Sequence, residues 1–153
     1  MGFNATWARI WSSLKDIPLL LMRLVLAYGF LHPALTKWKD IHAIGDWFSQ
    51  LHIIFPYANA YIVATCESLG VVLLTLGLFV RYITVPLMVS MVVAVAAVHW
   101  QNGFEAGNNG FEIPLYYFIM LFTLLSYGAG RISFDHLLFN ERKRNRKLKG
   151  GWR

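Results

Sequence analysis

The stretch ANAYIVATCESLGVVLLTLGLFV, residues 58–80, decides the fold class of this chain. It is apolar along most of its length, and Glu67 is its single charged residue. A helix crosses the hydrocarbon core of a bilayer with about 20 predominantly apolar residues. The stretch therefore predicts a membrane-spanning helix. Glu67 lies in the middle of that span, where a carboxyl group needs a partner or a water-filled cavity.

Three further stretches have the same character, and they cover residues 17–38, 82–101 and 111–128. Together with 58–80 they predict an all-α membrane protein built as a bundle of four transmembrane helices. Pro33 lies inside the first span, where it predicts a kink. The other prolines of the spans lie near helix starts, where a missing N–H costs little; they are Pro18, Pro86 and Pro114.

The composition agrees with this class. Hydrophobic residues make up 57% of the 153 residues and charged residues only 14%, whereas a soluble domain carries about 25% charged residues. Such a chain is too apolar to be disordered. Its single cysteine, Cys66, excludes an internal disulfide framework, a CxxC redox pair and a cysteine-built zinc site.

The net charge of +6 comes from the C-terminus. Residues 142–153 hold seven of the 14 lysines and arginines and no acid, so residues 1–141 have a balance of −1. A basic tail beside an apolar body indicates a topology signal rather than a nucleic-acid module. We therefore expect a membrane domain over 1–141, a basic cytoplasmic tail over 142–153, and both termini in the cytoplasm.

Two segments predict amphipathic helices lying on the bilayer surface. In 41–55, apolar residues recur at helical spacing, with Trp47 as an interfacial anchor. A similar stripe near the N-terminus contains Phe3, Trp7, Ile10, Trp11 and Leu14. Between the third and fourth spans the sequence NGFE occurs twice, at 102–105 and 109–112. Because Asn-Gly favours tight turns, this repeat predicts two turns.

Five ionisable residues lie inside or at the edges of the spans: Arg23, His32, Glu67, His99 and Glu112. An ionisable side chain in such a position needs a partner or a water-filled cavity. Arg23 and Glu67 differ in depth by about 7 Å, so they can form a pair. His32, His99 and Glu112 share the outer layer. Alternatively, Arg23 extends to the inner interface, and His99 and Glu112 are ordinary boundary residues. Arg23 and His32 are nine residues apart and fall on roughly opposite faces of a helix.

Five motifs in order resemble the DoxX family of small four-helix membrane proteins. They are MRLVLAYGFLH, CESLGVVLLTLGLFVR, HWQNGF, NNGFE and GAGRISFD, spread over residues 17–137. The resemblance marks Arg23, Glu67, His99 and Glu112 as recurring polar positions. His32 also matches, although family members often continue His-Gly where this chain has His32-Pro33.

The resemblance implies a multi-pass protein of a bacterial-type inner (plasma) membrane. Relatives are linked to quinone-coupled oxidation of sulfur compounds and to membrane complexes that defend against oxidative stress. One hypothesis is therefore a quinone-linked oxidoreductase, or a subunit of one, with membrane lipid and a protein partner in a redox or stress-response complex. Its catalytic residues would be Glu67, His99, Glu112, Arg23 and His32, and Arg23, Glu67 and His99 would bind the quinone.

The alternative is a non-enzymatic membrane anchor, chaperone or scaffold, in which the polar cluster specifies helix packing. A homo-oligomer is compatible with either function. A haem held by His32 and His99, or a metal held by His32, His99 and Glu112, is a weaker expectation than a quinone.

Overall fold

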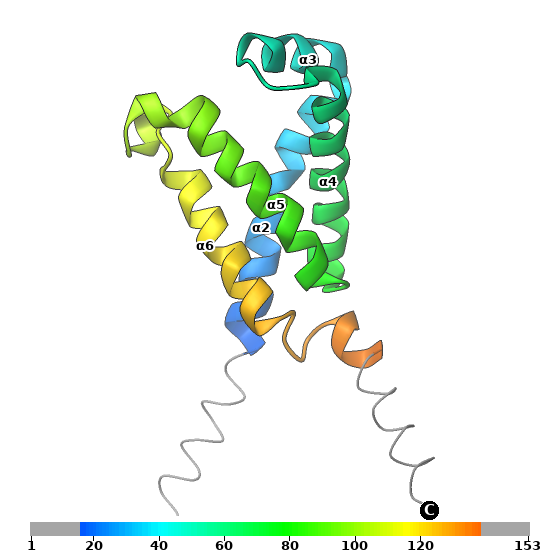
Figure 1. The fold of residues 1–153 in the computed structure, drawn as a ribbon. Coiled ribbons are helices and arrows are strands. Elements are labelled where there is room, and N and C mark those ends of the chain that lie inside the picture. Colours follow the sequence, from blue (N-terminus) through cyan, green and yellow to red (C-terminus); the bar gives the residue numbers. More distant parts are fainter. Residues whose placement is uncertain (1–15, 139–153) are drawn as a thin grey trace, which may run out of the picture.

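The computed structural model describes residues 16–138. This part of the chain is all-α, without a strand, and Figure 1 shows its helices. The predicted N-terminal amphipathic stripe and the basic tail lie outside the described residues. The main elements are α2 (Asp16–Lys39), α3 (Ile41–Gln50), α4 (Pro56–Leu76), α5 (Val80–Ala94) and α6 (Glu112–Tyr127).

Each predicted span is a helix, and the predicted boundaries hold within a few residues. Among the residues that the structure describes, three helices are long and apolar enough to cross a membrane: Asp16–Lys39, Pro56–Leu76 and Val80–Asn102. The third consists of α5, a π-helical turn (Val95–His99) and a 3-10 turn (Trp100–Asn102). The fourth apolar helix, α6, has 16 residues and is shorter than the other three.

The helices form two pairs that meet at one end of the molecule (Figure 1). α2 packs along α4, and α5 packs along α6. At the end where α4 finishes and α5 begins, which we call the base, the pairs lie close together. Towards α3 the α5–α6 pair leans away from α2 and α4 (Figure 1). The helices therefore pack closely at the base and diverge towards α3.

The hydrophobic core lies between the helices. Its fully buried side chains include Leu26, Phe30, Leu74, Val80, Leu87, Leu121 and Leu124. Glycines set two close approaches: a Cβ at Gly29 would lie 1.9 Å from the Tyr117 hydroxyl, and one at Gly70 would lie 2.8 Å from Leu87. Many large apolar side chains remain exposed around the outside, as expected for surfaces that face lipid.

The predicted amphipathic helix at 41–55 is confirmed as α3, but it ends at Gln50. Its N-terminus is capped by the Asp40 carboxylate, which accepts a hydrogen bond from the Ala43 N–H at 2.9 Å. Phe48 and Gly45 are its buried residues. The segment after Gln50 turns into α4, where Pro56 is the first helical residue and Phe55 has a positive φ.

The predictions made for the prolines and for the NGFE repeat can be compared with the structure. α2 is one helix through Pro33. Pro86 is the seventh residue of α5, so its predicted position near the helix start is wrong. The two predicted turns of the repeat are confirmed. The backbone has a positive φ in each copy, 75° at Gly103 and 59° at Asn109. The two copies lie side by side, since the Glu112 N–H donates to the Phe104 carbonyl at 3.0 Å.

Candidate functional site

A cavity of about 810 Å³ lies between the two helix pairs, below α3. Its wall is mostly apolar and is contributed by α2, α3, α4, α5 and α6. Polar side chains are few, and the main ones are Lys37, Asn59, Cys66, Glu67, Ser90 and His99. A cavity of this size with few polar groups on an apolar wall has the ordinary character of a small-molecule site.

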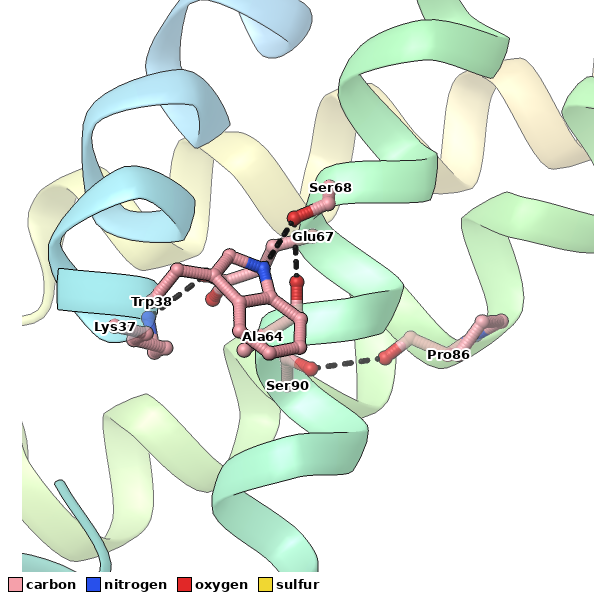
Figure 2. A network of polar contacts seen from close by, with 7 residues as sticks. All are labelled: Lys37, Trp38, Ala64, Glu67, Ser68, Pro86 and Ser90. Atoms are coloured by element: carbon pink, nitrogen blue, oxygen red, sulfur yellow. Dashed lines mark hydrogen bonds and ion pairs between the residues drawn. The ribbon is translucent and has the colours of Figure 1, made fainter. Parts of the chain in front are cut away.

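The central polar feature of the wall is an ion pair between Lys37 and Glu67. Lys37 Nζ lies 2.7 Å from Glu67 Oε2, and the two side chains are 15% and 5% exposed. Figure 2 shows Lys37 reaching from α2 towards Glu67 on α4. Glu67 thus has the partner that a carboxyl group inside the membrane requires.

A second polar link between α2 and α4 lies next to this ion pair. The Trp38 indole N–H donates to the Ser68 hydroxyl at 2.9 Å, and Ser68 donates to the Ala64 carbonyl at 2.8 Å (Figure 2). Both links join consecutive residues of α2 to consecutive residues of α4. They fix the register of the two helices at the cavity.

His99 reaches the cavity through the π-helical turn. The Trp100 N–H donates to the Val95 carbonyl five residues back, and such a turn is wider than an α-helical one. In a regular α-helix, residues five apart point about 140° away from each other. Here Ala94 and His99 both line the cavity. The π turn therefore places His99 on the cavity side.

The His99 ring is held in one tautomer. Its Nδ1 lies 2.7 Å from the Asn109 carbonyl oxygen. Because a carbonyl only accepts hydrogen bonds, Nδ1 carries the proton, and Nε2 is the acceptor of the neutral ring. Asn109 itself has a positive φ, and Asn102 also donates to its carbonyl, at 3.1 Å. The loop thus orients the imidazole through Nδ1.

Glu112 does not line the cavity. Its carboxylate accepts hydrogen bonds from the Ala106 N–H at 3.0 Å and from the Tyr116 hydroxyl at 3.1 Å. These contacts tie the loop to the first turn of α6. In the structure, Glu112 therefore holds the loop that orients His99.

Arg23 lies at the base, and its predicted pairing with Glu67 is wrong. Its guanidinium donates to the Leu74 carbonyl at 3.3 Å and to the Ile132 carbonyl. Leu74 is seven residues beyond Glu67 on α4, about 10 Å along the helix axis. Arg23 is 1% exposed. It binds the last turn of α4, where the Leu74 carbonyl also accepts the Gly77 N–H at 3.2 Å, and the segment after α6.

His32 is exposed on the outer face of α2 and does not line the cavity. The prediction that Arg23 and His32 occupy opposite faces is confirmed, because Arg23 is buried. His32 and Glu112 both lie outside the lining that contains His99. Within residues 16–138, no three His, Cys, Asp or Glu side chains are gathered as metal ligands.

The sequence pattern of the DoxX family matches residues 18–100, more than half of the chain. The chain belongs to the DoxX family. An uncharacterized protein of Haemophilus influenzae is 28% identical to it over 132 residues, which cover 81% of this chain and 85% of that protein. No solved structure matches the chain significantly. This DoxX protein is thus a multi-pass membrane protein whose cavity lies among its apolar helices.

Lys37 is a residue of the DoxX cavity that the sequence analysis does not single out. A signal was available in the spacing. Buried residues of α2 recur at intervals of four and three, and Lys37 continues that series; they are Arg23, Ala27, Phe30 and Ala34. Arg23 and Lys37 therefore both lie on the buried face of α2.

Proposed function

We propose that this DoxX protein binds a membrane-soluble quinone in the cavity and exchanges protons with it, as part of a redox system of a bacterial-type inner membrane. The observation that carries the proposal is the Lys37–Glu67 ion pair on the wall of an apolar cavity of about 810 Å³. A quinone headgroup is a flat ring with two carbonyl oxygens, which suits an apolar wall with one or two hydrogen-bond donors.

The side chains of the wall have the required donor and acceptor types. Lys37 can donate to a carbonyl oxygen while it keeps its contact with Glu67, because an ammonium group has three donors. Glu67 and the Nε2 of His99 can accept hydroxyl protons. They stand on different walls of the cavity, on α4 and on the π turn.

A bound quinone supplies the redox chemistry, since it takes two electrons and two protons to become a hydroquinone. In this proposal the two electrons come from a partner dehydrogenase in the same membrane. The role of this chain is to hold the headgroup away from water, to orient it by Lys37, and to move protons through Glu67 and His99.

The same proposal includes four membrane crossings with the base in the cytoplasm. α6 runs beside α5 and buries Leu121 and Leu124 against the other helices (Figure 1). At the base, Arg81 opens α5 and Arg131 follows α6. The loop between the π turn and α6 has no lysine or arginine. This asymmetry supports an orientation with the base inside and the cavity towards the outer half of the bilayer.

A binding titration tests the proposal. Purified protein is titrated with decyl-benzoquinone while tryptophan fluorescence is followed, because Trp47 lines the cavity. We expect saturable quenching that is at least about tenfold weaker in Ala97→Phe, which fills the cavity, and in Glu67→Gln, which removes the charged acceptor.

Ala96→Phe is the matched control, since Ala96 is exposed and does not line the cavity. It should bind quinone within about twofold of the wild-type protein. Wild-type protein that shows no saturable quenching would overturn the proposal and favour the anchor or scaffold function instead.

A further inference from the structure

α4 and α5 pack closely near the base and diverge towards α3 (Figure 1). Their backbones approach at Gly70, where an added Cβ would lie 2.8 Å from the Leu87 side chain. From that level towards α3, α5 leans away from α4 (Figure 1). Residues of both helices above the contact line the cavity, among them Ile62 and Val63 on α4 and Val89 and Val93 on α5.

The outer edge of this gap is both exposed and apolar. Four cavity-lining residues of α4 and α5 are between 43% and 58% exposed: Ile62, Val85, Val89 and Val93. The three valines are spaced by four residues and share one face of α5. Ser90, beside them, donates its hydroxyl to the Pro86 carbonyl at 3.1 Å. We call this edge the α4–α5 window, and it offers a passing molecule almost only apolar contacts.

α3 and the turn after it form the cavity wall at the end away from the base. Trp47 and Phe48 of α3 and Leu51 and Ile53 of the following turn line the cavity from that side. Phe48 is buried, and Gly45 packs so closely on Tyr57 that a Cβ there would lie 2.2 Å from the ring. α3 therefore lies tightly on α4 as a cover.

We infer that the ligand enters sideways from the bilayer through the α4–α5 window, and that it is a quinone with a long apolar tail. Its headgroup lies at Lys37 and Glu67, and its tail passes between Ile62 and the valines into the hydrocarbon. This inference rests on the proposed quinone function and narrows it to a lipid-tailed substrate. Exposed valine side chains inside a span carry no free-energy penalty in lipid, and they border an apolar passage into the cavity.

The test compares two probes on protein in nanodiscs: decyl-benzoquinone, which has a tail, and duroquinone, which has none. The variant Val89→Trp/Val93→Trp narrows the window. We expect its association rate for decyl-benzoquinone to fall at least about tenfold, with duroquinone affinity within about twofold of the wild-type value. Val92→Trp is the matched control, because Val92 is equally exposed on α5 but faces α6; it should leave both probes unchanged.

The outcomes separate this inference from the proposed function. Unchanged binding of both probes in the double variant would overturn the window and leave the quinone site intact. Loss of both probes alike would also contradict the window, because the tryptophans would then act on the headgroup pocket itself. If the wild-type protein binds neither probe, the quinone function fails.

Discussion

The two cations on the buried face of α2, Arg23 and Lys37, have different surroundings. They are 14 residues apart, about 21 Å along the helix. Arg23 lies in the packed base, where it binds the Leu74 and Ile132 carbonyls. Lys37 lies at the cavity, where it pairs with Glu67. A charged residue in a span can therefore stabilise the helix packing or contribute to a ligand site, and the group that it binds shows which of the two roles it has.

The largest expected effect is that of Arg23→Met on stability. The variant keeps an apolar stem but removes the charged donor from the Leu74 carbonyl, which retains the Gly77 N–H, and from the part-buried Ile132 carbonyl. A hydrogen bond from a charged group is worth about 1.5–3 kcal/mol. We expect the free energy of unfolding to fall by about 4 kcal/mol, measured by SDS titration, while the folded fraction still binds quinone. Unchanged stability with lost quinone binding would place Arg23 in the ligand site and break the comparison.

Lys37→Met should have the next largest effect. It leaves the Glu67 carboxylate buried without its partner, which costs about 3 kcal/mol. The double variant Lys37→Met/Glu67→Met should recover most of this stability, because a buried ion pair can be replaced by apolar residues at little cost. It should still fail to bind quinone in the fluorescence titration. Recovered stability together with wild-type binding would show that the pair is not part of the ligand site.

Gly77→Ala tests how tightly the base surrounds Arg23. Gly77 has a φ of 68°, and a Cβ there would lie 2.0 Å from Arg23 Nη1. We expect a loss of about 2 kcal/mol, half of it from the left-handed backbone and half from the clash. In the Arg23→Met background the same change should cost only about 1 kcal/mol. Equal costs in both backgrounds would mean that Gly77 and Arg23 do not interact.

The smallest effects belong to two helix caps. At the base, the Asp135 carboxylate accepts hydrogen bonds from the Phe79 and Val80 N–H groups at 2.8 and 3.1 Å. At the cavity end, Asp40 caps α3. Asp135→Ala and Asp40→Ala should each cost about 1 kcal/mol in thermal unfolding. Only Asp40→Ala should also speed quinone release, because α3 covers the cavity. Faster release from Asp135→Ala instead would contradict this division between the ends.

Much of the fold was predictable because spans are set by length and apolarity alone. The helices at 17–38, 58–80, 82–101 and 111–128 follow from that rule, and so does the amphipathic α3. The hydrogen-bond and ion-pair partners of the polar residues do not follow from length and apolarity. A depth estimate places Arg23 within reach of Glu67, but depth alone carries no information on the Leu74 and Ile132 carbonyls that Arg23 binds instead.

The site was partly predictable for the same reason. Glu67 and His99 were both expected at functional positions, and both line the cavity. The π turn that directs His99 inwards has no signal in the sequence of valines and alanines at 95–98. Lys37 could have been found from the spacing of buried residues on α2, since it continues their stripe.

The central claim, that the cavity holds a quinone, is tested most directly by measuring the quinone that copurifies with the protein. Wild-type protein and Ala97→Phe are purified in mild detergent from membranes of a host that makes quinones, and extracted quinone is quantified per chain by chromatography. We predict about one quinone per wild-type chain, since such sites are few per protein, and only background in Ala97→Phe. Equal background amounts in both proteins would contradict the account.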